Sequence, residues 1–445
     1  MPKRYKEIQA QITKKYQLHY LDNPTSRSLA ENIKDLSIDD IINLLKEVRD
    51  TPELTEMSIS LSRRSNLFDK LVLMKGDKPH GWALRLHIYN MVGQSDEPGY
   101  VLSNLNKKIR NDENHIHEHS WQLASRFLIG GFKNHQFAKT ELGPLFNRYN
   151  LVPTMKDEVS ESTSFRRALL EGQTGIIETD QDLYQQGDLV HYPIEIPHKI
   201  DTRASSYLGM TITLAHTSER QHENSIFYEE IQSDQVEEVK ELAIEAHKYT
   251  KKTHYEAINI AITNLELIKL CDHLAEKGFV RFNRFVDPIT KKLSPNNVLE
   301  TELLPTIAML ILQENEEFIE YPLTAELQGK SQKEIQKLKE KYANRSGELK
   351  KIIEDAIKDM HKPSLMQLIR TSQQNLFAKL YTASRDNLAP DVLQVVNKRD
   401  RKIPEHVLGS VGFFSHKQGV KTEASKLMEE KCISLTESFH CSYGS

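Results

Sequence analysis

Cysteine is scarce in this sequence. The three cysteines, Cys271, Cys432 and Cys441, are scattered, and their number is odd. Such a set argues against a disulfide framework of the kind that stabilises small secreted domains, and it lacks the paired spacing of a zinc–thiolate site. We therefore expect a protein of a reducing compartment, with the cytoplasm as its location.

Long apolar runs are lacking too. The N-terminal stretch MPKRYKEIQAQITKKY carries charges where a secretory signal needs an apolar core. The longest apolar run, residues 303–312, is interrupted by Pro305 and has about half the length of a membrane span. We expect no signal peptide, no transmembrane segment and no membrane partner. The Lys-, Asn- and Ile-rich composition is typical of a low-GC bacterium, for which non-classical secretion as an effector stays open.

A strong charge of one sign is also absent, since the formal net charge is −4 at pH 7. The chain therefore has no overall attraction for nucleic acid, and we expect no nucleic-acid partner. The sequence contains no GxGxxG or Walker-type phosphate loop and no internal repeat. Its 445 residues, 38% hydrophobic and 27% charged, suffice for two or three domains with apolar cores.

The hydrophobic periodicity predicts an N-terminal helical segment over residues 1–66. Apolar residues recur there at helical spacing, and one predicted helix, ending near Val48, follows Ser37 as its N-cap. The residue before a proline avoids the α region, so the Thr51-Pro52 pair should end that helix. We expect the segment to cover a β domain.

From residue 67 the period changes to that of β-strands. In the stretch 82–89, Leu84, Leu86 and Ile88 alternate with Arg85 and His87, so the two sets should face opposite sides of a sheet. Short strands with turn signals predict a β-sandwich or β-barrel domain over 67–220, with an irregular insertion or lid at 141–172. Helices are predicted beyond it, in a domain at 221–398 whose first helix spans 236–249, and a polar tail follows at 399–445.

Histidines give the sequence its clearest chemical signal. His115, His117 and His119 stand at every second position, so in a strand all three side chains share a face. Neutral imidazole is a good ligand for iron, zinc, copper and nickel, so this face predicts a metal site. A second segment, GDLVHYPIEIPH, ends in His198, whereas His191 within it stands an odd number of positions away and is interpreted as structural.

The two histidine segments resemble the two motifs of the cupin superfamily, which are small metal-binding β-barrels. His117-Glu118-His119 followed by Gly131 has the spacing of the first motif, with Ala124 in place of its glutamate. Gly187, Pro193 and His198 have the spacing of the second motif, with Glu195 where glycine is usual. The resemblance covers roughly residues 67 to 216. It implies an α+β chain in which a jelly-roll barrel lies between a helical cover and a C-terminal all-α region.

Without the glutamate, the pattern is most similar to that of the three-histidine thiol dioxygenases, such as cysteine dioxygenase. The resemblance implies that Fe(II) is held by His117, His119 and His198, with His115 as an alternative ligand or a neighbour of the ligands. Arg85 would then bind a substrate carboxylate, and Tyr207 is the tyrosine nearest to the position of the catalytic tyrosine of that branch. The chain departs from the branch at Ala215-His216, where no tyrosine is in register, and in a longer interval between the histidine pair and His198.

Together these features predict a metal-dependent, cupin-type enzyme. The leading hypothesis is a non-haem Fe(II) dioxygenase that takes dioxygen and a small substrate bearing a thiol or carboxylate. Nickel, zinc or manganese would indicate an isomerase or hydrolase instead, with Glu195, His87 or Tyr207 as candidate bases. The rival hypothesis is a non-catalytic cupin scaffold, a bacterial regulatory or effector protein, that acts through its C-terminal helices. These helices are also the expected surface for a homodimer or a protein partner. A 2-oxoglutarate oxygenase is disfavoured because Glu118 directly follows His117 and would face the other way.

Overall fold

The N-terminal part of the chain is helical, as predicted. The helices are α1 (Lys3–Lys15), the π-helical η1 (Tyr16–Leu21), α2 (Ser26–Ile33), α3 (Ile38–Asp50) and α4 (Pro52–Leu61). Ser37 caps α3 through a reciprocal capping box with Asp40. Helix α3 ends at Asp50, and α4 begins with Pro52 in its first turn, where proline is well tolerated. Both the cap and the break are therefore confirmed.

The computed structural model describes residues 3–21, 24–65, 68–76, 81–89, 116–153, 164–202, 210–222, 224–231, 238–244, 246–283, 285–286, 293–312 and 329–372. Two residues of the sequence-based hypothesis, His115 and Tyr207, lie outside these ranges, as does the predicted tail at 399–445. No helix among the described residues is both long and apolar enough to cross a membrane.

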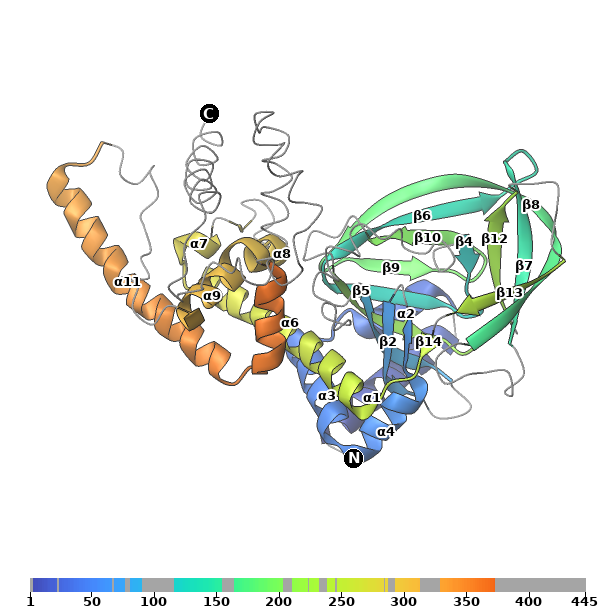
Figure 1. Cartoon of the computed structure of the whole chain (residues 1–445), viewed down its shortest axis with the longest axis horizontal. Helices are drawn as coiled ribbons and strands as arrows, with labels where there is room; N and C mark the ends of the chain where they lie inside the picture. Colours follow the sequence, from blue (N-terminus) through green and yellow to red (C-terminus); the bar gives the residue numbers. More distant parts are fainter. Residues whose placement is uncertain are drawn as a thin grey trace, which may run out of the picture. The chain divides into compact units, whose positions relative to one another are not determined.

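Two antiparallel sheets follow the N-terminal helices (Figure 1). Sheet A has the strand order β14-β1-β2-β3-β11-β5-β9, and sheet B the order β13-β8-β6-β10-β4-β12-β7. Because β8 pairs with both β6 and β7, the strands of sheet B other than β13 close into a ring. The strands of sheet A are β1 (Arg63–Ser65), β2 (Phe68–Lys75), β3 (Ala83–Tyr89), β5 (Leu123–Ile129), β9 (Leu189–Tyr192), β11 (Thr211–Thr217) and β14 (Ala246–His247). Those of sheet B are β4 (Ile116–Glu118), β6 (Gly131–Lys139), β7 (Leu145–Pro153), β8 (Ser164–Gln185), β10 (His198–Asp201), β12 (Ser225–Glu230) and β13 (Val239–Ile244).

Two sequence-based predictions about these strands were wrong. The stretch 141–172 contains β7 and the first part of β8, which pair with each other, rather than an irregular insertion. Its charged residues are compatible with a strand because alternate positions of β8, such as Arg167 and Glu171, are exposed. The described residues of the stretch 236–249 include β13 and β14 instead of a helix, and β12 precedes them. Pairing of β13 with β8 outweighs the helical preference of its sequence, so strands continue to His247.

The strand β3 separates two cores. Its apolar side chains, Leu84, Leu86 and Ile88, belong to a large core that they share with the N-terminal helices and with α6 (Lys251–Glu276). Its other face carries Arg85 and His87 and continues into a smaller core built from both sheets. We call this the inter-sheet core, and its buried members are Tyr89, Leu123, Phe127, Phe132, Val190, Tyr192, Ile200 and Ala215. The predicted alternation is thus confirmed, but the polar face of β3 is turned inward.

The helices after the sheets begin with α6, which Thr250 caps. It packs along α3, with a salt bridge of 2.7 Å from Lys46 Nζ to Glu266 Oε1 (Figure 1). The remaining named helices are α7 (Val280–Asn283), α8 (Pro295–Val298), the π-helical η5 (Leu299–Leu303), α9 (Leu304–Leu312) and α11 (Gln332–Lys358). Helix α11 runs without interruption through residues 344–347.

Candidate metal centre

The position of the histidines follows from strand register. His117 is the central residue of β4, and His198 is the first residue of β10. The two are directly opposite each other across the antiparallel β4–β10 pair, so their side chains leave the sheet on the same face. His119 follows two residues after His117, immediately beyond the end of β4, and keeps the same side. Three imidazoles are therefore brought together by two short strands.

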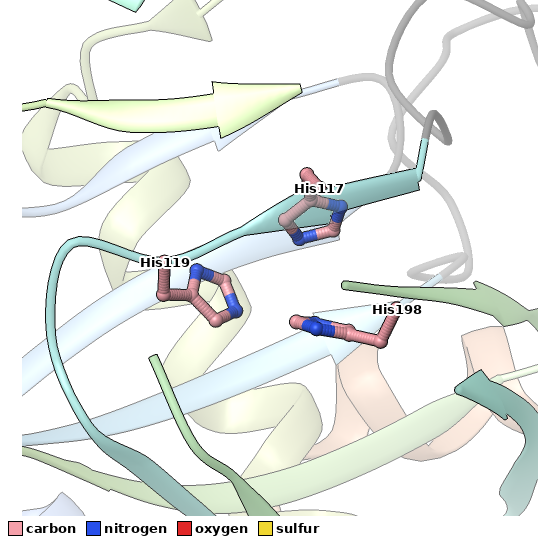
Figure 2. Close-up of side chains that lie close together, drawn as sticks. All are labelled: His117, His119 and His198. Atoms are coloured by element: carbon pink, nitrogen blue, oxygen red, sulfur yellow. The ribbon is translucent and has the colours of Figure 1, made fainter. Parts of the chain in front are cut away.

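The three side chains converge (Figure 2). One ring nitrogen of each lies within 4.8 Å of one ring nitrogen of the others. The ring centroids are separated by 4.9 Å for His117–His119, 4.5 Å for His117–His198 and 4.9 Å for His119–His198. A metal ion placed between such nitrogens would have ordinary metal–imidazole distances after small side-chain adjustments.

The imidazoles are held in the form that binds metals. Burial lowers the pKa of His198 well below its ordinary value, and the neighbouring His117 lowers it further. Burial likewise lowers the pKa of His119, and the neighbouring His198 and His117 lower it further. Both rings are therefore neutral at pH 7. The Nδ1–H of His198 donates to the carbonyl of Ile196 at 3.3 Å, which leaves Nε2 as its lone-pair donor to a metal.

Glu118, between the two histidines of β4, does not join the cluster. It lies opposite Ile226 across the β4–β12 pair and is buried on the other face of the strand. Its Oε1 accepts a hydrogen bond from the Tyr228 hydroxyl at 2.5 Å and lies 2.7 Å from Lys139 Nζ. Among the described residues, the potential metal ligands gathered here are therefore three histidines without a carboxylate. This donor set fits a divalent transition metal such as iron, zinc or nickel, and does not by itself select one of them.

Aromatic rings enclose the histidines. Trp121 stacks on His119 with 5.4 Å between ring centroids, and Tyr192 packs against His198 at 4.4 Å. The Arg85 guanidinium lies over the Trp121 ring at 5.3 Å, and that of Arg220 lies 5.9 Å from the same ring. Burial, with a smaller effect from Arg220, lowers the pKa of Arg85 to about 10, so Arg85 remains a cation at neutral pH. Two neighbouring cations beside an apolar ring favour an anionic ligand next to the metal centre.

A polar pocket of about 390 Å³ also reaches His119. Its lining combines the cations Lys139 and Arg148 with the carboxylates of Glu118 and Glu195. Lys139 pairs with Glu118, and Arg148 pairs with Glu171 at the rim. The pocket therefore connects one ligand of the candidate metal centre to a charged surface in which positive and negative groups balance.

Only some of the predicted site residues lie in or beside the histidine cluster. The structure brings His117, His119 and His198 together and places Arg85 beside them, behind Trp121. His191 stands outside the cluster and pairs in register with Ala124.

His216 stands in the segment where the thiol dioxygenase branch has its tyrosine, and its side chain points away from the histidine cluster. It lies on the opposite side of sheet A, where its Nδ1–H donates to Leu29 of α2. Sequence reasoning missed Tyr192 and Arg220. Tyr192 stands next to the second histidine motif, while Arg220 had no local signal at all.

A comparison of the chain with protein-family models and with curated proteins gives no match. The two antiparallel sheets and the three-histidine cluster fit a cupin-like arrangement. Since no family matches, the functional argument depends on the chemistry of the three histidines.

Proposed function

We propose that this chain is a metal-dependent enzyme of cupin-like jelly-roll architecture, and specifically a non-haem Fe(II) dioxygenase for a small carboxylate-bearing substrate. The observation that carries the proposal is the convergence of three imidazoles in a partly buried site without a carboxylate ligand. His117, His119 and His198 would hold the Fe(II), which would supply binding positions for a substrate donor atom, such as a thiolate, and for dioxygen. The three neutral ligands leave the charge of the bound ion uncompensated, which favours an anionic substrate.

The chain's own residues have three roles in this proposal. Arg85 binds the substrate carboxylate through its planar guanidinium, and Trp121 fixes the plane of that guanidinium. Tyr192 and Trp121 exclude water from the faces of His198 and His119. The hydrogen bond from His198 to the Ile196 carbonyl keeps the ring in one orientation. The polar pocket beside His119 is the proposed route for substrate and dioxygen.

Metal content per chain tests the proposal. Wild-type protein reconstituted anaerobically with Fe(II) should bind about one iron per chain, and His119→Ala and His198→Ala should lose it. His191→Ala is the matched control, because this histidine lies on β9 of sheet A, outside the cluster. Iron-loaded protein should then consume dioxygen in the presence of small thiol or hydroxy acids, and Arg85→Lys should raise the KM for the acid. A wild-type chain that binds no metal would contradict the enzyme hypothesis and favour a non-catalytic scaffold.

A further inference from the structure

The inter-sheet face beside the metal centre holds buried polar atoms that have no hydrogen-bond partner among the described residues. They belong to five side chains: Arg85 Nε, His87 Nε2, both amide atoms of Asn134, the Tyr192 hydroxyl and Thr213 Oγ1. Folded proteins rarely bury such atoms unpaired, because each loses its hydrogen bonds to water without replacement. A group of five therefore indicates either ordered water or a ligand that supplies the missing partners.

Strand register places these five side chains on the inner faces of the two sheets, Asn134 on sheet B and the other four on sheet A. Thr213 lies directly opposite His87 across the β3–β11 pair, and Arg85 precedes His87 by two residues. Asn134 lies opposite Ile200, which follows His198 by two residues on the same face of β10. Tyr192 contacts the His198 ring directly. The unpaired atoms therefore line the surface that continues from the histidine cluster into the inter-sheet core.

Asn134 is the most specific of the five. It is 0% exposed, and both its donor and its acceptor lack a described partner. A side-chain amide presents an N–H and a carbonyl oxygen side by side. Its natural complement is another group with an adjacent donor and acceptor, and a primary carboxamide offers both in matching geometry. The hydroxyls of Thr213 and Tyr192 adjust to either role and do not restrict the ligand in this way.

We propose that Asn134 determines substrate specificity, and that the substrate is a small carboxylic acid that also bears a primary carboxamide. This inference rests on the proposed function, which places the carboxylate at Arg85. The carboxamide then exchanges two hydrogen bonds with Asn134, and Thr213 and Tyr192 complete the polar surround. A site built in this way rejects an apolar analogue of the same shape, because the analogue leaves the Asn134 amide buried and unpaired.

Binding to the zinc-loaded full chain tests this inference, since zinc occupies the site without redox turnover. The probes are malonamate, succinamate and glutaramate, each compared with the acid of equal shape in which isopropyl replaces the carboxamide: isovalerate, 4-methylpentanoate and 5-methylhexanoate. Titration calorimetry should show that one carboxamide acid binds at least about tenfold more tightly than its counterpart. In Asn134→Leu, which keeps the side-chain shape, this preference should vanish while the branched acid binds as before or more tightly.

Unfolding experiments on the metal-free protein separate a ligand-binding role from a structural one. Asn134→Leu removes two unpaired polar atoms and should leave the melting temperature unchanged or raised. Thr263→Val is the matched control, because Thr263 in α6 is equally buried, its Oγ1 has no partner among the described residues, and it lies outside the inter-sheet core. It should behave like Asn134→Leu in unfolding and leave the acid preference intact.

Equal affinity for every acid and its counterpart, or a preference that survives in Asn134→Leu, would overturn the inference and leave ordered water as the partner of Asn134. In either case binding of zinc and of the branched acids would still support the metal centre and the carboxylate site on which the proposed function depends. A wild-type chain that takes up no zinc would overturn both.

Discussion

Acid should destabilise this protein through His216, a histidine remote from the metal centre. The His216 ring is fully buried between sheet A and α2, with its edge or face against Tyr16 and Trp82. A carbonyl only accepts, so the 3.2 Å contact with Leu29 makes Nδ1 the protonated nitrogen. Its Nε2 has no partner among the described residues. Protonation would therefore place a charge and an unpaired N–H in an apolar setting.

The size of the effect follows from linkage. Burial lowers the pKa of His216 from 6.5 to about 4, and the hydrogen bond to Leu29 offsets only part of this effect. As the pH falls below 6.5, the unfolded chain takes up a proton that the folded chain does not accept until the pH nears 4. The contribution of the neutral His216 to the unfolding free energy is thus fully present above pH 6.5 and is lost as the pH falls to 4. A difference of about 2.5 pKa units corresponds to about 3 kcal/mol of unfolding free energy.

Urea unfolding of the metal-free protein between pH 4 and 7.5 measures this loss, with His216→Asn as the test variant. Asparagine keeps an N–H for the Leu29 carbonyl and cannot titrate, so its cost in packing is the same at every pH. Other buried histidines, such as His254, titrate equally in both proteins. The difference in unfolding free energy between wild type and variant should therefore shift by about 3 kcal/mol across the range. Parallel pH profiles for the two proteins would refute the reasoning.

Three further predictions concern the metal, the Glu118 network and the N-terminal helices. Zinc at about a hundred times its dissociation constant should raise the unfolding free energy of wild type by about 3 kcal/mol and that of His198→Ala not at all, as measured by urea titration. Lys139→Met should cost about 1–3 kcal/mol, because it leaves the Glu118 carboxylate buried without its cation. Adding Glu118→Gln should recover part of that cost; a larger loss in the double variant would contradict the network. Ser37→Ala should cost about 1 kcal/mol through loss of the α3 cap, and unchanged thermal unfolding would show that the cap is dispensable.

Local signals in the sequence were reliable wherever the relevant interaction is local. The capping box at Ser37, the break at Pro52 and the alternation in β3 each involve residues within a few positions of one another. The same kind of reasoning failed at 236–249, where a sequence with helical preference becomes β13 because β8 offers a partner strand. It also failed at β7 and β8. Many residues of these strands are exposed and polar, so the sequence there shows no clear apolar alternation.

The sequence by itself determined that His117 and His119 share a face, because successive side chains of a strand alternate. It also showed that Arg85 and His87 oppose the apolar face of β3. Only the tertiary structure decided that this polar face turns inward, because the N-terminal helices cover the apolar side of sheet A. Only the tertiary structure placed His198 opposite His117, since strand register between distant segments is set by the whole sheet rather than by local sequence. The sequence therefore allowed the candidate ligands to be identified, whereas their convergence at one site could be seen only in the tertiary structure.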